Sequence, residues 1–137
     1  MGETTMTLEQ FLDGWNESAE GNRAGFLRLR DRLAGFAGIE ISFHPRPGLT
    51  YSLRGSVPGG ARPLFVMVDV IEDEPRWLSV CFYGDLVQDP EERGSFVPGG
   101  LLGEDALCFD LERCDDGEGL AYVEARIDEA YRAAIGG

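Results

Sequence analysis

One nine-residue stretch, PLFVMVDVI (63–71), is apolar in both of its alternating sets of positions except at Asp69. Successive side chains of a β-strand point to opposite faces of the sheet, so such a run fits a strand that is buried on both sides. A strand of this kind lies in the middle of a sheet, and other elements must cover each face. The sequence therefore predicts a sheet around this strand, with the helices at the two ends of the chain as its cover.

Two further segments, residues 39–44 and 49–54, alternate between apolar and polar side chains. Prolines and a glycine separate them, which favours a hairpin. A loop with an odd number of residues keeps the two apolar sets on one face of the sheet, whereas an even loop mixes them. We therefore expect Phe43 opposite Leu49, and we expect Ile41 in the core.

Similar patterns predict the remaining strands. RWLSVCFYG (76–84) follows an acidic turn, and ALCFDL (106–111) forms a short fifth strand. Between them, residues 84–105 are the longest irregular stretch, in which Asp89 followed by Pro90 predicts the start of a short helix. Long loops inside compact domains often carry function, so this stretch is a candidate lid or contact surface. Its apolar side chains could equally pin it to the core.

Helical patterns occupy both ends of the chain. Thr7 followed by Gln10 is a capping-box pattern, which predicts that a first helix begins there. Apolar spacing predicts a second helix from about Asn22 to Phe36 and a last one from about Gly119 to Ile135. The sequence thus predicts an α+β fold. It is a single domain over residues 1–137, a mainly antiparallel sheet of about five strands with N-terminal helices and a C-terminal helix packed on it.

The formal net charge of −13 limits the partners of this protein. Such a charge repels phosphate backbones and anionic lipid headgroups, so we expect neither nucleic acid nor a membrane surface as a partner. Every basic residue is an arginine, which excludes a lysine Schiff base and the lysine of a phosphate-binding Walker loop. The N-terminus has no basic region followed by an apolar stretch, so we expect a cytoplasmic protein.

The three cysteines, Cys81, Cys108 and Cys114, lack the Cys-x-x-Cys spacing of a zinc or redox pair. Their odd number and the apolar setting of Cys81 favour reduced thiols, as expected in the cytoplasm. The acidic stretch DLERCDDGEG (110–119) places Val123 where a calcium loop needs its bidentate glutamate. We therefore expect no metal site and no cofactor.

The only histidine, His44, stands at the end of a polar set of strand positions. The proline that follows it keeps its backbone extended. The chain contains no Gly-x-Ser-x-Gly nucleophile elbow. We therefore interpret His44 as a solvated residue at a strand end, and we predict no catalytic residue.

Arginine side chains surround this histidine in a chain whose other loops are acidic. A cationic patch there could hold a carboxylate or a phosphate through bidentate guanidinium contacts. The same arginines could instead form ordinary surface ion pairs, which contribute little to stability. Both interpretations remain open. The ligand-binding candidates are Arg46, Arg54, His44 and Tyr51.

A second candidate surface is aromatic. Aromatic residues are enriched at the centres of protein interfaces, and a two-fold dimer commonly buries such a patch. The interface candidates are Trp77, Tyr83 and Phe96. We expect a homodimer rather than a monomer, because apolar burial can outweigh the screened repulsion between two acidic chains.

The order of elements is also informative. Paired N-terminal helices precede the segments ISFHPRPGLTYSLRG (41–55) and RPLFVMVDV (62–70), and the chain closes with LLGEDALCFDL (101–111) and IDEAYRAA (127–134). This layout resembles the small YdhG-like bacterial domains over most of the chain after residue 20. The resemblance implies their fold and a bacterial cytoplasmic setting. It implies no activity, since those domains are largely uncharacterised.

These observations favour a non-enzymatic binding or protein-interaction module. The alternative is a protein that binds a small anionic ligand, or an enzyme that uses carboxylates and arginines. Its site would lie around the 44–54 hairpin and the 84–105 loop. The sequence leaves open whether the protein is an enzyme.

Overall fold

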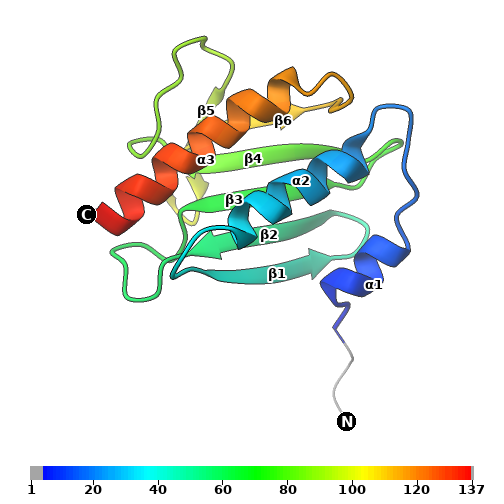
Figure 1. Ribbon diagram of the computed structural model, residues 1–137, viewed down its shortest axis with the longest axis horizontal. Helices are drawn as coiled ribbons and strands as arrows, with labels where there is room; N and C mark the ends of the chain where they lie inside the picture. Colours follow the sequence, from blue (N-terminus) through cyan, green and yellow to red (C-terminus); the bar gives the residue numbers. More distant parts are fainter. Residues whose placement is uncertain (1–4, 137) are drawn as a thin grey trace.

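Six strands form one antiparallel sheet in the order β1-β2-β3-β4-β6-β5, and α2 and α3 lie side by side across one of its faces (Figure 1). The structure is a computed structural model that describes residues 5–136. The predicted α+β fold is confirmed, with six strands rather than about five. The elements are α1 (Leu8–Asp13), α2 (Asn22–Ala34), β1 (Glu40–Arg46), β2 (Thr50–Ser56), β3 (Val66–Ile71), β4 (Trp77–Tyr83), β5 (Ser95–Leu101), β6 (Glu104–Leu111) and α3 (Glu118–Gly136).

The predicted capping box begins α1. The Thr7 hydroxyl accepts a hydrogen bond from the Gln10 amide at 3.1 Å, and the Gln10 side chain accepts one from the Thr7 amide at 2.9 Å. Both bonds satisfy amides that a helix start leaves without intrahelical partners. They fix the start of α1, whose Phe11 and Leu12 are buried in the core.

The first residue of α2 joins three segments. The side chain of Asn22 is fully buried, and its amide group donates to the Arg76 carbonyl at 2.8 Å and to the Glu112 carbonyl at 3.0 Å. These carbonyls lie at the start of β4 and just beyond the end of β6. A single amide therefore holds the N-terminal end of α2 where β4 begins and β6 ends.

The β1–β2 hairpin is tighter than the sequence predicted. Phe43 lies opposite Leu53 rather than Leu49, and the pairing continues out to Arg46 opposite Thr50. The loop is three residues long, and Gly48 adopts a φ of +86° that favours glycine. The predicted loop and the observed loop are both odd, so the apolar set stays on the expected face. The tighter loop adds backbone pairs to the hairpin, and it leaves Leu49 in the turn, 58% exposed.

The main core lies between the helices and one face of the sheet. On β3 the set Val66, Val68 and Val70 is fully buried there. The large residues of this core come from all layers: Phe11, Phe26, Leu29, Leu33, Leu53, Leu78, Val80, Phe82, Phe109, Val123 and Ile127. The helix side of the sheet is therefore closed, as the apolar pattern of the strands requires.

The prediction that helices cover both faces of the sheet is wrong. Within residues 5–136 all three helices contribute to the core on the same face. The other set of β3, which consists of Met67, Asp69 and Ile71, is only half-buried. We call this second face the open face. Its residues are Ser42, His44, Arg46, Thr50, Ser52, Arg54, Met67, Asp69, Ile71, Trp77, Ser79, Cys81, Cys108 and Asp110.

A small second core lies at one end of the open face. Leu64, Tyr83, Leu101 and Ala106 are buried together there, where β5 ends against the sheet. The sequence pattern missed β5, because its centre is Pro98-Gly99-Gly100 and its pairing with β6 shifts register between Val97 and Leu101. Proline and irregular pairing are usual on edge strands, where they oppose pairing with other chains.

Candidate functional site

A row of polar side chains crosses the open face from strand to strand. His44 lies opposite Ser52, Ser52 opposite Asp69, Asp69 opposite Ser79, and Ser79 opposite Asp110. Residues that lie directly opposite each other on paired strands share one face of the sheet. The five side chains therefore all point to the open face, away from the helices. The sequence reveals the alternation within each strand, but only the observed registers align these residues across five strands.

Asp69 occupies the centre of this row. Its Oδ1 atom is inaccessible to solvent and has no hydrogen-bond partner among the described residues. Burial raises the pKa of the Asp69 carboxyl, and the Ser52 hydroxyl and the charges of Arg54 and Arg46 act against that rise. A half-buried carboxylate on the exposed side of a central strand is costly unless charges or donors compensate for it.

Two arginines flank the polar row on the β1–β2 hairpin. Arg46 lies two residues beyond the row on one side, opposite Thr50, and Arg54 lies two residues beyond it on the other side, opposite Ser42. The Arg54 Nε donates to the Ser52 hydroxyl at 3.2 Å. Within the described chain, neither arginine has a carboxylate at ion-pair distance. The predicted alternative of ordinary surface ion pairs therefore does not describe these two residues.

His44 lies between the two arginines on β1. Its Nε2 is 2.8 Å from the Ser42 hydroxyl, and its side chain is exposed. Partial desolvation and the positive charge of Arg54 lower the pKa of His44, which favours the neutral imidazole. Ser52 separates it from Asp69 in the row, which is not the order of a Ser-His-Asp triad.

Tyr51, the fourth ligand-binding candidate, is on the opposite face. Its ring stacks on Phe11 with centroids 4.2 Å apart, and its hydroxyl donates to Glu72 at 2.8 Å. Tyr51 and Leu53 are two residues apart on β2, so their side chains point to the same face of the sheet, and Leu53 is fully buried under the helices. The structure therefore brings together Arg46, Arg54 and His44, and it separates Tyr51 from them.

The three aromatic interface candidates do not form one patch. Trp77 lies half-buried on the open face, and its Nε1 donates to Asp73 at 3.2 Å. Tyr83 is only 1% exposed, with the Arg62 guanidinium 4.4 Å from its ring centroid. Phe96 is 62% exposed on the edge strand β5, where it pairs with Leu107. Tyr83 therefore has no surface to offer a partner.

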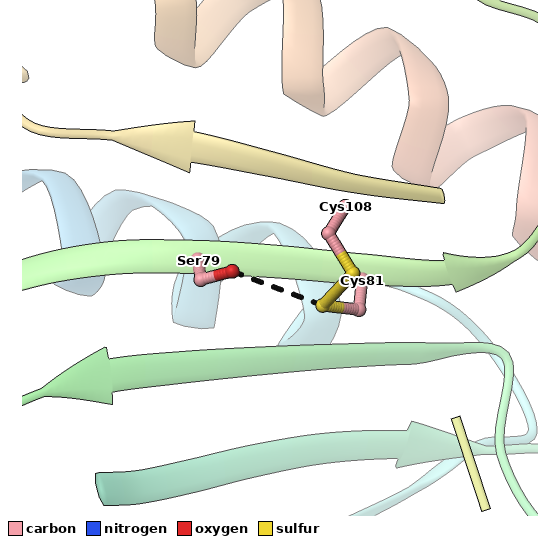
Figure 2. The surroundings of a disulfide bond; sticks show 3 residues. All are labelled: Ser79, Cys81 and Cys108. Carbon is pink, nitrogen blue, oxygen red and sulfur yellow. Dashed lines mark hydrogen bonds between the residues drawn. A yellow bond between two sulfur atoms is a disulfide. The ribbon is translucent and has the colours of Figure 1, made fainter. Parts of the chain in front are cut away.

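Cys81 and Cys108 form a disulfide between β4 and β6 (Figure 2). The expectation of three reduced thiols is wrong for this pair, because the register places the two residues directly opposite each other. The separation of 27 residues between the two cysteines does not by itself predict a disulfide, because the bond depends on the pairing of β4 with β6. Cys114 is a free thiol, and burial raises its pKa to about 12.

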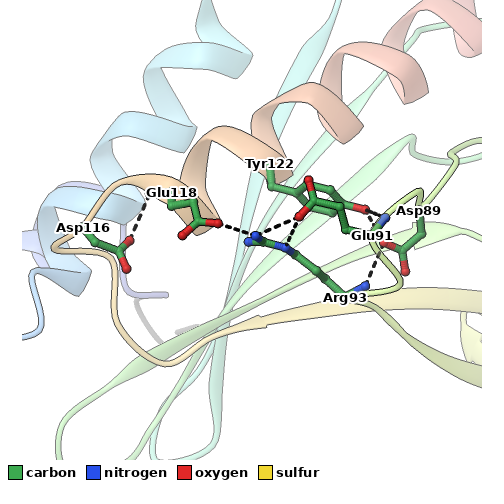
Figure 3. A network of polar contacts seen from close by, with 6 residues as sticks. All are labelled: Asp89, Glu91, Arg93, Asp116, Glu118 and Tyr122. Carbon is green, nitrogen blue, oxygen red and sulfur yellow. Dashed lines mark hydrogen bonds and ion pairs between the residues drawn. The ribbon is translucent and has the colours of Figure 1, made fainter.

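The segment 84–94 is fixed to α3 rather than being a free lid (Figure 3). The Tyr122 hydroxyl donates to Asp89 and accepts from the Glu91 amide, while Arg93 contacts Glu91 and Glu118. The predicted short helix is absent there. Asp89 instead accepts the amides of Arg93 at 2.9 Å and of Gly94 at 2.8 Å, which closes a turn.

A cavity of about 370 Å³ lies at the end of this region and is lined by Arg62, Asp85, Phe96 and Glu104, among others. Arg62 contacts Asp85 at 2.7 Å and Glu104 at 3.1 Å. Its charge is therefore already neutralised by carboxylates, which makes the cavity a poor site for an anion. The open face holds the less neutralised arginines.

Comparison of this chain with protein-family models, with curated proteins and with solved structures finds no match. Among residues 5–136, no helix combines the length and the apolar character that crossing a bilayer requires. The candidate site therefore stands on its own geometry.

Proposed function

We propose that this protein is a binding module whose open face holds an anionic group, a carboxylate or a phosphate, between Arg46 and Arg54. One observation supports this most strongly. In a chain of net charge −13, two arginines on the same uncovered face have no carboxylate at ion-pair distance within residues 5–136. A guanidinium offers a planar pair of donors that matches both anions.

The row between the two arginines supplies further polar groups. Arg46 and Arg54 lie on neighbouring strands, offset along the strand direction by four residues, which corresponds to about 13 Å. The His44 and Ser52 side chains occupy the interval. An anion above this pair would have a guanidinium on each side and polar groups beneath it. The negative charge of Asp69 opposes an anion here, while the charges of Arg46 and Arg54 favour the ionised form of that carboxyl.

The bound anion could be a free small molecule or a side chain of another protein. Both sources share the same chemistry, and the sequence-based expectation of an interaction module is compatible with either. We also propose the bacterial cytoplasm as the setting, which the YdhG-like layout supports. Catalysis is not part of this proposal.

Isothermal titration with inorganic phosphate, with citrate and with a phosphoserine-containing peptide tests the site. We expect saturable binding of at least one probe, weakened about tenfold or more in Arg46→Gln and in Arg54→Gln, because each substitution removes a charge-assisted contact. Tighter binding of the peptide than of the free anions would indicate a protein partner.

The control is Arg132→Gln, which removes the same charge from an exposed position on α3. It should leave the affinity unchanged. Equal weakening in all three variants would indicate a general charge effect, and no saturable binding of any probe would overturn the proposal.

Self-association is a second proposal, and the edge strand β1 supports it. Five of its seven residues are exposed, from Glu40 to Arg46, and the outer edge of a sheet presents unpaired backbone groups to other chains. Pairing of two β1 strands would extend the sheet across two copies. Light scattering on a sizing column at low and high salt checks this, because salt screens the repulsion between acidic chains. A mass of 15.0 kDa at both salt concentrations would exclude the dimer.

A further inference from the structure

The disulfide joins two residues that the sheet already holds together. β4 and β6 pair continuously from Leu78 opposite Leu111 to Tyr83 opposite Ala106, and Cys81 and Cys108 lie inside this ladder. Their Cα atoms are 4.1 Å apart. Since backbone hydrogen bonds and core packing fix both strands, breaking the sulfur–sulfur bond leaves two thiols facing each other in a folded protein.

The sulfur atoms lie on the open face, where helices do not cover them (Figure 2). Cys81 is buried, with 5% exposure, whereas Cys108 is half-buried. An incoming thiolate therefore reaches the Cys108 sulfur more readily. The Ser79 hydroxyl lies 3.8 Å from the Cys81 sulfur, where it can donate to a thiolate that forms there.

We propose that Cys81 and Cys108 form a reversible redox pair that exchanges with dithiol reductants and with disulfide oxidants while the protein stays folded. This inference does not depend on the proposed anion site. Disulfides of cytosolic proteins are usually transient or redox-sensing, which agrees with the proposed setting.

In reduction, a thiolate of the dithiol attacks the Cys108 sulfur, and the bond between the two cysteine sulfurs breaks. Cys81 leaves as a thiolate that accepts a hydrogen bond from Ser79 and then takes up a proton. The second thiol of the reductant loses its proton and attacks the reductant's sulfur in the mixed disulfide, which releases Cys108 as a thiolate that takes up a proton. The protein gains two electrons and two protons, and the reductant becomes a disulfide. Oxidation is the reverse sequence.

Cys114 provides an internal reference. It lies outside the sheet ladder, its side chain is buried, and its Sγ is in contact range of the backbone of α2 at Gly25. Burial raises its pKa to about 12, so it holds almost no thiolate at neutral pH. Exchange at the pair should therefore leave Cys114 unmodified in the folded protein.

The experiment equilibrates the folded protein in mixtures of reduced and oxidised dithiothreitol, alkylates free thiols and measures intact mass and labelled peptides. We expect two labels, on Cys81 and Cys108, to appear together as the mixture becomes more reducing. Far-ultraviolet circular dichroism should stay unchanged, and oxidised dithiothreitol should restore the pair. Labelling only after denaturant is added, or failure to re-form the bond on oxidation, would overturn the proposal.

A rate measurement tests the role of the serine separately. Ser79→Ala should slow reduction by dithiothreitol about two- to tenfold, the rate equivalent of one hydrogen bond. Ser42→Ala removes a hydroxyl from the same face on β1, away from the sulfurs, and should leave the rate unchanged. An unchanged rate in Ser79→Ala would remove the serine from the mechanism, and equal slowing in both variants would attribute the effect to the face as a whole.

Discussion

Asp69 lies directly opposite Ser52 in the β2–β3 register, and both side chains face away from the helices. This places an acidic group with an unpartnered oxygen beside two arginines that have no ion pair within residues 5–136. In the proposed anion site, Asp69 should therefore affect both the stability of the protein and its affinity for the anion.

Asp69→Asn should raise the affinity of the open face for sulfate about two- to tenfold, because it removes a negative charge next to the bound anion. Isothermal titration of both proteins at pH 7.5 measures this. Asp110→Asn, at the far end of the same row, is the matched control and should have a smaller effect. A decrease in affinity for Asp69→Asn would contradict the proposed position of the anion.

The same substitution should change how stability depends on pH. The pKa of Asp69 is higher in the folded state than its ordinary value of 3.8, so the folded state binds more protons than the unfolded state between the two values. The contribution of Asp69 to the free energy of unfolding is therefore present at low pH and declines as pH rises through the folded pKa. The difference in unfolding free energy between Asp69→Asn and the native protein should grow from pH 4 to pH 7.5 in denaturant titrations. A constant difference would show that burial does not disturb this carboxyl.

Sulfate affinity should also increase as pH falls, since His44 gains a positive charge between the arginines when it is protonated. Its pKa is lowered from 6.5, so the midpoint of the His44 contribution should lie below that value. Sulfate itself does not titrate in this range. His44→Gln should reduce the pH dependence to the part that protonation of Asp69 contributes, and it should leave the free energy of unfolding within about 0.5 kcal/mol of the native value. If His44→Gln retains the full pH dependence, another group is responsible.

The contact between α2 and Cys114 should tolerate no added methyl group. A Cβ on Gly25 would lie 2.5 Å from the Cys114 Sγ and 2.6 Å from its Cβ. Gly25→Ala should therefore lower the free energy of unfolding by roughly 1 to 3 kcal/mol, although alanine favours a helix. Gly136→Ala, also in a helix but with open space around its Cα, is the control and should change little. Denaturant titration compares the two.

The disulfide should stabilise the protein mainly through the unfolded chain. It closes a loop over a sequence separation of 27, which corresponds to roughly 3 to 4 kcal/mol of lost chain entropy in the unfolded state. Guanidinium titrations with and without a reductant should differ by about this amount, and a Cys81→Ser, Cys108→Ser variant should not respond to the reductant. A native protein that is equally stable in both conditions would contradict this account.

The alternation of apolar and polar residues along each strand was the most informative feature of the sequence. It placed His44 and Arg54 among the polar positions and Phe43 in the same apolar set as Leu53, even though the exact register was wrong and Arg46 was expected in the loop. It failed for Ile41, which was expected in the core but is 38% exposed, because β1 is an edge strand that the helices reach only in part.

Long-range pairing could not be predicted from local patterns. β5 lacks alternation at Pro98-Gly99-Gly100, so nothing in the sequence pattern predicts that this segment pairs with β6. The apolar run over β3 suggested that helices cover both faces of the sheet. Met67 and Ile71 are instead only partly buried, on the face without helices. The polar row and the disulfide depend on which strands are neighbours, and that arrangement arises only when the whole sheet is assembled.

The buried amide of Asn22 has a consequence for the order of events during synthesis. Its two acceptors are separated from it by 54 and 90 residues, and the second, at Glu112, emerges late from the ribosome. The helix that covers Phe109 and the neighbouring strands, α3, follows all six strands in the chain. A nascent chain therefore carries an uncovered apolar sheet face until α3 has emerged. Native packing of the sheet should follow the synthesis of α3, and the interval before it should be the time when the strands are most open to chaperones.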